Sequence, residues 1–399
     1  MIIRSRIVVP MEGEPIEDGA VVVEGNRIAS VARFDDVGRH HSGHLVDLGE
    51  HILLPGLINA HCHLDYTMLR GKIAPHGSFT EWIRTINAEK ATLTEQDYID
   101  AINVGFAEAR RFGTTTIANL TAFPHLAATV TEPVRTWWFG ELIDVRNPNP
   151  GLADKAVALL KPVKHWGLAP HAPFTASKQL YARCNEIVRG EGFLLTTHLA
   201  ESADEMQMFR DRTGSLFDFL RSIGRPMNDC GSGTPLSFLL QTEAIGQRWI
   251  IAHLNELDRH DFILLGDAPK FHVVHCPRSH TFFGHAAFAL DRLQALGFNI
   301  CLGTDSLASN SDLSLFAEMR ELLRNESGLS PREVLAMATL NGALALGQRG
   351  LLGTIQPGAF ADLVALPNVP SDADVFEKIV AFEETVPWMM LNGDIVTAG

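Results

Sequence analysis

Residues 54–69 read LPGLINAHCHLDYTML, an apolar run that ends in two histidines separated by one cysteine. The run is typical of a buried strand, and His61 and His63 come at its end. Side chains two residues apart on an extended segment point to the same side, so both imidazoles can bind one metal ion. The ordinary alternative is that two polar residues simply end a strand. Cys62, between them, is expected to point away and pack.

Seven further short apolar runs follow this stretch, and helical patterns separate most of them. Examples of these patterns are residues 95–113, 177–192 and 311–323, the last with Ser311-Asp312 as its expected N-cap. Eight buried strands interleaved with helices predict an α/β fold whose parallel sheet closes into a (β/α)8 TIM barrel. A doubly wound open sheet is the rival, but no GxGxxG follows an early strand. The predicted strands are residues 51–58, 114–120, 134–140, 166–170, 193–198, 248–253, 271–275 and 298–304.

Both ends of the chain are rich in strand patterns. Gly25-Asn26 and Asn392-Gly393 are hairpin signals between apolar runs. We expect the two ends to pair into a small β-sandwich beside the barrel. The predicted division is residues 1–53 for the N-terminal part of the sandwich, 54–355 for the barrel and 356–399 for the C-terminal part.

Polar residues end the predicted strands, and in a barrel all of them would meet at the C-terminal rim, where active sites of this fold lie. Imidazole nitrogens with one carboxylate suit a divalent transition metal, most commonly zinc. We expect four of them, His61, His63, His198 and Asp305, to be the ligands. The residues at the strand ends are His61, His63, His171, His198, His253, His275 and Asp305.

The same strand ends supply groups for acid–base chemistry. A bound metal lowers the pKa of its water towards neutrality and so creates a nucleophile. Glu201 follows His198 by three residues and is expected to be a proton shuttle. His253 could polarise the electrophile or donate to the leaving group, and Asp305 could accept the first proton of the water. Taken singly, the two histidines could be ordinary polar residues at a strand end, His198 with Glu201 a helix start, and Asp305 a helix cap or turn residue. The joint pattern therefore carries the prediction.

The composition excludes several classes of function. The chain of 399 residues has a net charge of −14 and no basic run, which argues against nucleic-acid polymers and anionic membrane surfaces. Its five cysteines are scattered without a CxxC pair, so neither a disulfide framework nor a thiolate zinc site is expected. The sequence contains no apolar run of about 18 residues, so no membrane span is expected. The first residues lack the pattern of a signal peptide, and a cytoplasmic location is expected.

Six motifs carry a family resemblance over nearly the whole chain. The sequence resembles the amidohydrolase superfamily, in the branch of adenosine-type, S-adenosylhomocysteine, guanine and cytosine deaminases and triazine chlorohydrolases. The resemblance implies the barrel and sandwich, the same metal ligands, Glu201 as proton shuttle and His171 on the substrate side. It also suggests that Trp82 stacks on a heterocycle, a buried helix anchor being the alternative. The motifs are PGLINAHCHLD, APHAPFTAS, HLAES, IIAHLNELD, HCPRS and LGTDSLASN.

Two positions bear on how far the resemblance extends. Binuclear relatives carry a carboxylated lysine at the end of strand four, where this chain reads GLAPHAPF and Lys164 precedes the strand. One metal is therefore expected, which leaves His253 free for catalysis. After strand seven the relatives usually have asparagine where this chain has His280, and the role of residues 278–283 stays open. Arg278 could face a carboxylate or leaving group of the substrate, or form a salt bridge at the rim.

The expected activity is the deamination of an aminated heterocycle by a metal-bound hydroxide, with release of ammonia. The candidate substrates are an aminopurine, a related base, or an adenine nucleoside such as S-adenosylhomocysteine, methylthioadenosine or aminodeoxyfutalosine. The expected cofactor is one divalent ion, Zn²⁺ before Fe²⁺, Ni²⁺ or Mn²⁺, and a homodimer is compatible with the sequence. One alternative is a triazine-type hydrolase that displaces chloride or an alkylamine at the same site. An inactive barrel that serves as a scaffold is an alternative of another class.

Overall fold

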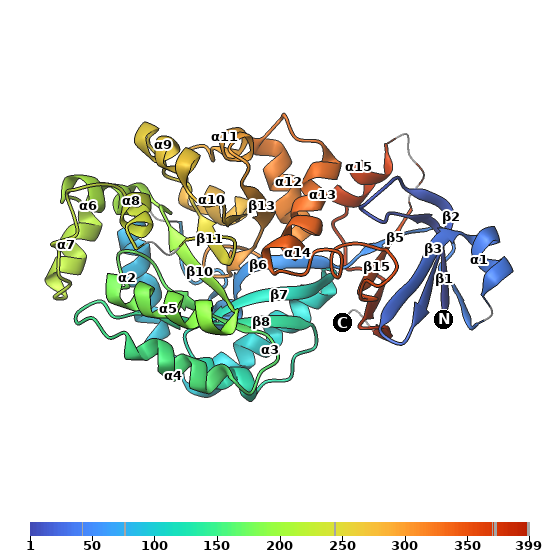
Figure 1. Cartoon of the computed structure of the whole chain (residues 1–399), viewed down its shortest axis with the longest axis horizontal. Helices are drawn as coiled ribbons and strands as arrows, with labels where there is room; N and C mark the ends of the chain where they lie inside the picture. The colour runs from blue at the N-terminus through green and yellow to red at the C-terminus, as the bar shows by residue number, and fades with distance from the viewer. Residues whose placement is uncertain (42, 76, 243–244, 369, 371–372, 397–399) are drawn as a thin grey trace.

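The computed structural model describes residues 1–41, 43–75, 77–242, 245–368, 370 and 373–396. Two β-sheets organise the molecule, and helices pack mainly on the larger one (Figure 1). The smaller sheet takes its strands from both ends of the chain, so the N- and C-terminal segments lie at the same end of the molecule (Figure 1). The larger sheet uses the strands between residues 57 and 306.

The smaller sheet joins the two ends of the chain as the sequence predicts, in the order β17-β16-β15-β5-β1-β2-β3, with β4 paired to β1. Asn392 and Gly393 have φ angles of 52° and 89°, which is the backbone that a two-residue type I′ hairpin turn requires. Its strands are β1 (Ile2–Val8), β2 (Ile16–Glu24), β3 (Arg27–Arg33), β4 (Leu45–Asp47), β5 (His51–Pro55), β15 (Leu363–Pro367), β16 (Trp388–Leu391) and β17 (Asp394–Val396).

The larger sheet is parallel and curled. Its strands are β6 (Leu57–His63), β7 (Thr114–Thr121), β8 (Arg135–Leu142), β9 (Trp166–Pro170), β10 (Leu194–Leu199), β11 (Trp249–His253), β12 (His272–His275), β13 (Asn299–Leu302) and β14 (Asp305–Ser306). Strand β13 pairs with β12, and β14 pairs with β6 at the other edge. Only Gly303 and Thr304 separate β13 at one edge from β14 at the other.

The first predicted strand, residues 51–58, is two strands in two different sheets. Strand β5 pairs with β1 and β15 in the smaller sheet, and β6 begins the larger sheet at Leu57. A Cβ atom on Gly56 would lie 2.1 Å from the side chain of Thr115, so only glycine fits at the crossing point. The apolar run is continuous in the sequence because both of its halves are buried.

Helices cover the outer face of the larger sheet (Figure 1). The last of the three quoted helical patterns begins later than predicted: Ser314, and not Ser311-Asp312, caps α12 by accepting from Ala317 N. Asp312 instead accepts from Ser314 N. The α-helices are α1 (Phe34–His40), α2 (Phe79–Lys90), α3 (Glu95–Arg111), α4 (Gly151–Leu160), α5 (Lys178–Glu191), α6 (Ala203–Asp211), α7 (Ser215–Ser222), α8 (Pro235–Leu240), α9 (Arg259–Asp267), α10 (Pro277–Phe283), α11 (Leu290–Ala295), α12 (Leu315–Asn325), α13 (Pro331–Met337), α14 (Leu340–Ala345) and α15 (Val375–Val380), with 3₁₀ helices at Leu64–Leu69 and Pro124–Ala128.

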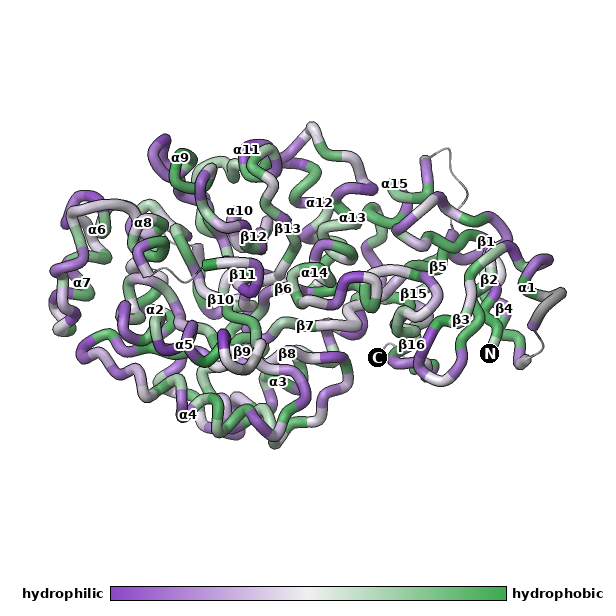
Figure 2. The backbone as a smooth tube through the Cα atoms, in the orientation of Figure 1, coloured by the Kyte–Doolittle hydropathy of each residue, from purple (hydrophilic) through white to green (hydrophobic). Residues whose placement is uncertain are grey.

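The strands of the larger sheet are buried on both faces. Trp137 and Phe139 of β8 join one apolar cluster, and Trp138, between them, joins another. This alternation follows the two-residue period of a strand that has one core inside the curl and a second core under the helices. Figure 2 shows hydrophobic and hydrophilic residues alternating along the surrounding helices. No helix in the described ranges is long and apolar enough to cross a membrane.

Candidate metal centre and active site

The five residues predicted for metal binding and proton transfer at strand ends lie together at the C-terminal edge of the larger sheet. His61 and His63 lie at the C-terminal end of β6. His198 is in β10, His253 ends β11 and Asp305 begins β14. All five side chains are buried. A register shift between Asn59 and Cys62 in the pairing of β6 with β7 adjusts the direction of the β6 end. Cys62 is packed in the core, as predicted.

The distances between the nitrogen and oxygen atoms fit a shared cation. His63 Nε2 lies 3.2 Å from His198 Nε2, and Asp305 Oδ1 lies 3.7 Å from His61 Nε2 and 3.8 Å from His63 Nε2. Two ligands of a tetrahedral zinc ion are roughly 3.3 Å apart, given zinc–nitrogen distances of about 2.0–2.1 Å. Within the described ranges, three overlapping groups have ligand atoms within 4.8 Å of one another: His61 with His198 and His253, His61 with His63 and Asp305, and Glu201 with His253 and Asp305.

The imidazoles are in the form that binds metal. Burial lowers the pKa of His198 to about 4 and the pKa of His63 well below its usual value, so both rings are neutral at pH 7. His198 Nδ1 donates to the carbonyl of His171 at 2.8 Å, which leaves the lone pair on Nε2. Neither ring nitrogen of His61 has a hydrogen-bond partner in the described structure. A buried imidazole with an unpartnered ring nitrogen is what a metal ligand requires.

Asp305 is held as a charged carboxylate that faces the imidazoles. Burial raises its pKa, but the neighbouring histidines lower it further, and the result lies well below the usual value. Ser279 Oγ donates to Asp305 Oδ2 at 2.7 Å and Ser309 Oγ at 3.1 Å, which turns Oδ1 towards the histidines. Asp305 and His253 have φ angles of 57° and 73°, a left-handed backbone that non-glycine residues rarely adopt. Such strain commonly accompanies functional sites.

Glu201 and His253 form a second pair beside the ligand atoms. His253 Nε2 lies 3.7 Å from Glu201 Oε1 and has no hydrogen-bond partner among the described residues. Burial, followed by the charges of Asp305 and Glu205, raises the pKa of Glu201 well above its usual value. Asn255 Nδ2 donates to the Glu201 carbonyl at 3.1 Å and so fixes the backbone. A carboxyl group with a raised pKa next to a possible nucleophile site is suited to carry protons.

Glu205 positions this glutamate and should make stability depend on pH. It accepts from Glu201 N at 2.8 Å, and burial raises its pKa from 4.5 to about 8. The folded protein therefore holds this proton more tightly than the unfolded chain, and its contribution to stability is lost as pH rises through that window. A Glu205→Gln variant should melt higher relative to wild type at about pH 8.5 than at about pH 5.5 in calorimetry. The exposed Glu186→Gln is the control, and an equal shift at both pH values would contradict the prediction.

A cavity of about 140 Å³ opens onto the ligand cluster and contains two of the predicted substrate residues, Trp82 and His171. The Trp82 ring centroid is 5.9 Å from that of Phe79 and 5.0 Å from that of Phe283, and its buried Nε1 has no partner in the described structure. Trp82 is thus both packed in the wall and able to contact a ligand. The lining residues are His63, Tyr66, Phe79, Trp82, Ile83, Ile86, Asn87, Lys90, Glu141, Ile143, His171, Phe174, Thr175, His198, Glu201, His253, Asp305 and Ser306.

Arg278 is not brought to this cavity. Its guanidinium forms an ion pair with Asp312 at 2.6 Å and also contacts Ser311, and it lines a separate groove on the rim. Its backbone N–H donates to Glu318. Of the two interpretations that the sequence left open, the structure shows the salt bridge at the rim.

Several residues of the cavity were missed from the sequence. Glu141 lies at the end of β8. The expectation that functional residues follow the strands, which predicted the histidines, therefore applies to Glu141 as well. Lys90 reaches the cavity from the last turn of α2, and Tyr66 from the 3₁₀ helix after β6. No local pattern marks these two. Ser279 and Ser309, which orient Asp305, likewise come from separate segments that meet only in the fold.

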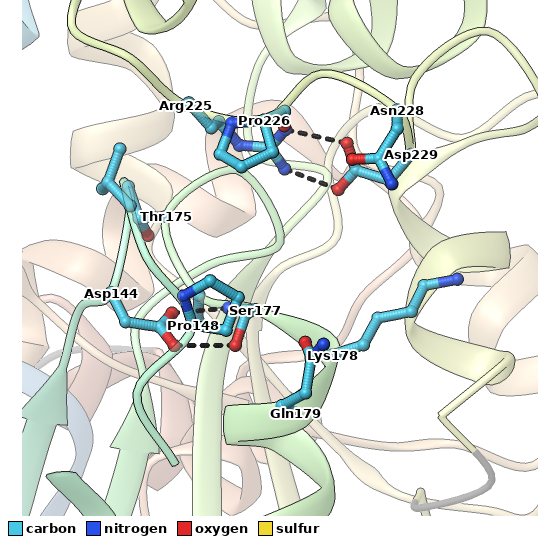
Figure 3. Close-up of a pocket in the computed structure, with 12 residues that line it drawn as sticks. Asp144, Pro148, Thr175, Ser177, Lys178, Gln179, Arg225, Pro226, Asn228 and Asp229 are labelled. Carbon is cyan, nitrogen blue, oxygen red and sulfur yellow. Dashed lines mark hydrogen bonds and ion pairs between the residues drawn. The ribbon is translucent and has the colours of Figure 1, made fainter. Parts of the chain in front are cut away.

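A second cavity, of about 370 Å³, lies behind the loop that follows β9 (Figure 3). Its polar side chains satisfy one another: Arg225 pairs with Asp229 at 2.7 Å, and Asp144 accepts from the Ser177 backbone and hydroxyl at 2.6 and 2.7 Å (Figure 3). Thr175 lines both cavities. These contacts hold the loop that carries His171. They leave no group of unpaired acid–base side chains among the described residues named here.

The fold and the cluster together define a class: an α/β protein with a candidate metal centre at the carboxyl ends of its parallel strands. The model of the amidohydrolase family matches residues 52–396. The chain therefore belongs to the amidohydrolase family, and the resemblance inferred from the motifs is confirmed. The predicted class of enzyme, a hydrolase acting on carbon–nitrogen bonds, is confirmed with it.

Three relatives illustrate the similarity. The 5-methylthioadenosine/S-adenosylhomocysteine deaminase of Syntrophobacter fumaroxidans is 30% identical over 375 residues, which cover 89% of this chain and 81% of the relative. An adenosine deaminase from Xanthomonas campestris with bound zinc superposes with a TM-score of 0.84 at 25% identity, over 99% of this chain and 92% of that one. The Helicobacter pylori aminofutalosine deaminase in complex with methylthio-coformycin gives 0.87 at 20% identity, over 99% of both chains.

Proposed function

We propose that the chain is a metal-dependent deaminase that releases ammonia from the aminated ring of an adenine nucleoside or a related heterocycle. The observation that carries the proposal is the buried cluster of histidines and Asp305, with Glu201 beside it, opening onto a cavity lined by aromatic rings. Methylthioadenosine, S-adenosylhomocysteine and aminodeoxyfutalosine are the candidate substrates. The names of the relatives support this class of substrate.

We propose His61, His63, His198 and Asp305 as the ligands of one divalent metal ion. Zn²⁺ fits the histidine-rich donor set best, before Fe²⁺, Ni²⁺ or Mn²⁺. The unpartnered nitrogens of His61 and the 3.2 Å approach of His63 Nε2 to His198 Nε2 support the assignment. When bound, such an ion supplies Lewis acidity that lowers the pKa of a water molecule.

The protein side chains would then move the protons of the hydrolysis. A water oxygen adds to the ring carbon that bears the amino group. Asp305 accepts the first proton of this water, and Glu201 gives its own proton to the ring nitrogen. Glu201 then takes the remaining proton from the added oxygen and passes it to the departing amine, and the proton held by Asp305 returns to Glu201. The bond from carbon to the amine breaks, ammonia leaves and the ring carbon becomes a carbonyl. His253, with its free Nε2, stabilises the charge that develops on the attacking oxygen.

The substrate would lie in the cavity between α2 and the strand ends. Trp82 is proposed to stack on the heterocycle, since its ring lines the cavity, and its buried Nε1 is free to donate. His171 is proposed to contact the substrate near the ring, because it lines the cavity next to His198, with ring centroids 4.8 Å apart. Its Nδ1 is engaged with Thr175 Oγ1 at 2.6 Å, which orients the ring.

The finer architecture and cellular setting are part of the same proposal. We infer that the curled sheet is a closed (β/α)8 barrel of residues 54–355, and that residues 1–53 and 356–399 form a β-sandwich. The pairing of β14 with β6 and the joint sheet of both ends support this. A cytoplasmic enzyme, active on small molecules and possible as a homodimer, suits the acidic chain, which offers no basic surface run for nucleic acid.

The test is an ammonia-release screen with the metal-loaded enzyme over adenine nucleosides, free aminopurines, pterins and triazines. We expect ammonia from the adenine nucleosides, with a turnover that chelation abolishes and added metal restores. Release of chloride or an alkylamine from triazines, without ammonia from nucleosides, would favour the triazine-hydrolase alternative. Purified protein without stoichiometric metal in elemental analysis, and without turnover on any compound, would overturn the proposal in favour of a scaffold.

A further inference from the structure

The catalytic cavity has an apolar wall and a polar far end. One face of α2 forms the wall: Phe79, Trp82, Ile83 and Ile86 line the cavity first. In the last turn of the helix the lining changes to Asn87 and Lys90. The metal ligands therefore face aromatic and aliphatic groups, and charged groups gather where a substrate would place its non-reacting part.

Glu141 is the acceptor at this polar end. Its side chain is only 5% exposed and lines the cavity from the end of β8. His171 Nε2 lies 3.9 Å from Glu141 Oε1, too far for a hydrogen bond. Burial raises the pKa of this carboxyl, which Lys90 partly offsets. A buried carboxylate without a donor is costly unless a ligand supplies one.

Lys90 is the donor that faces it. Its ammonium lies 4.5 Å from the ring centroid of Tyr66, and no carboxylate of the described residues is within ion-pair distance of it. Lys90 lines the same cavity as Glu141, and its charge lowers the pKa of that carboxyl. The cavity thus offers the Glu141 carboxylate as a hydrogen-bond acceptor and the Lys90 ammonium as a donor. The two groups do not form an ion pair with each other in the described structure.

We propose that Glu141 and Lys90 bind the vicinal hydroxyls of a ribose, so that the enzyme selects ribonucleosides over free bases. This inference rests on the proposed function, in which the base reacts at the ligand cluster. A vicinal diol donates two hydrogen bonds, which a carboxylate can accept, and it also accepts from an ammonium group. A free base or a triazine has no hydroxyl groups at this end of the cavity. Its binding would leave Glu141 and Lys90 without hydrogen-bond partners, which is strongly disfavoured.

The position of His171 gives the right order along the cavity. Its ring centroid lies 4.8 Å from that of His198 on the metal side, and its Nε2 lies 3.9 Å from Glu141 on the polar side. A ligand with its ring at the ligand cluster and Trp82 would therefore pass His171 before reaching Glu141. This sequence of contacts is that of a base followed by its sugar.

The experiment compares adenosine with 2′,3′-dideoxyadenosine in ammonia release by the metal-loaded wild type, Glu141→Gln and Lys90→Met. We expect wild type to prefer adenosine by at least about 100-fold in kcat/KM. Glu141→Gln should lower kcat/KM for adenosine by about 10- to 100-fold and Lys90→Met by about 10-fold, mainly through KM. Both should change the value for the dideoxy compound by less than about 3-fold. Glu89→Gln, on the same helix but outside the cavity lining, is the matched control.

A merely structural role is distinguished by the pattern of losses. Equal losses on both nucleosides, or no preference of wild type for adenosine, would overturn the inference while leaving the deaminase function intact. Calorimetric binding of both nucleosides to the Glu201→Gln protein, which should not consume them, separates the two proposals. Tighter binding of adenosine that Glu141→Gln abolishes would support the inference even if wild type released no ammonia. Equal binding of both compounds would refute it.

Discussion

Replacing Glu201 with glutamine is expected to lower turnover by about 10²- to 10⁴-fold and to leave the metal content unchanged. Glutamine keeps the size of the side chain but cannot take up or give a proton. Glu201 is outside the proposed ligand set, and its carboxyl lies 3.7 Å from His253 in a buried position that favours the protonated form. The loss should therefore fall on kcat, with substrate binding retained.

The measurement is ammonia release under saturating substrate, with elemental analysis of the same preparation. Glu186→Gln on α5 is the control, because that side chain is 66% exposed and its ion-pair partner among the described residues is Arg183. A Glu201→Gln enzyme that turned over at the wild-type rate would exclude Glu201 as the proton carrier. An enzyme that lost both metal and turnover would instead make Glu201 a ligand, as its grouping with His253 and Asp305 allows.

The strands of the larger sheet could be predicted because burial on both faces leaves a clear signal in the sequence. Residues 134–140 are mostly apolar, with Trp137, Trp138 and Phe139 in succession, and β8 occupies Arg135–Leu142. The same feature hid the boundary between the two sheets. The run through Gly56 is apolar on both sides, and the chain changes sheets there because of a close approach to Thr115 that no local pattern reveals.

The candidate site was predictable where its residues follow strands and hidden where they do not. Parallel strands bring their carboxyl ends to one edge, so His61, His198 and Asp305 could be expected to meet. Lys90 comes from a helix, and Ser309 acts only through its bond to Asp305. Their positions depend on packing between distant segments, which a single sequence does not encode in any short motif.

Replacing Asp305 with asparagine is expected to remove the metal and, with it, all measurable turnover. Asp305 is the one carboxylate in the proposed ligand set, and the other three ligands are imidazoles. Ser279 and Ser309 both donate to Oδ2, so an asparagine should place its carbonyl there and turn its amide hydrogens towards His61 and His63. The variant would thus present donors where the cation needs a lone pair, and lose the charge that offsets it.

Three measurements check this expectation: elemental analysis after dialysis against a weak chelator, ammonia release, and melting temperature with and without added zinc. A ligand that binds only the folded state stabilises by about 2.7 kcal/mol at 100 times its Kd, so wild type should melt higher with zinc and Asp305→Asn should not. Asp312→Asn removes a carboxylate from the rim salt bridge with Arg278 and should respond to zinc like wild type. Stoichiometric zinc in Asp305→Asn would contradict the assignment, and the ion would then be held by His61, His198 and His253, whose nitrogens also lie within 4.8 Å of one another. In that case His253 could not stabilise the oxygen as proposed, and the acid–base chemistry would fall to Glu201 alone.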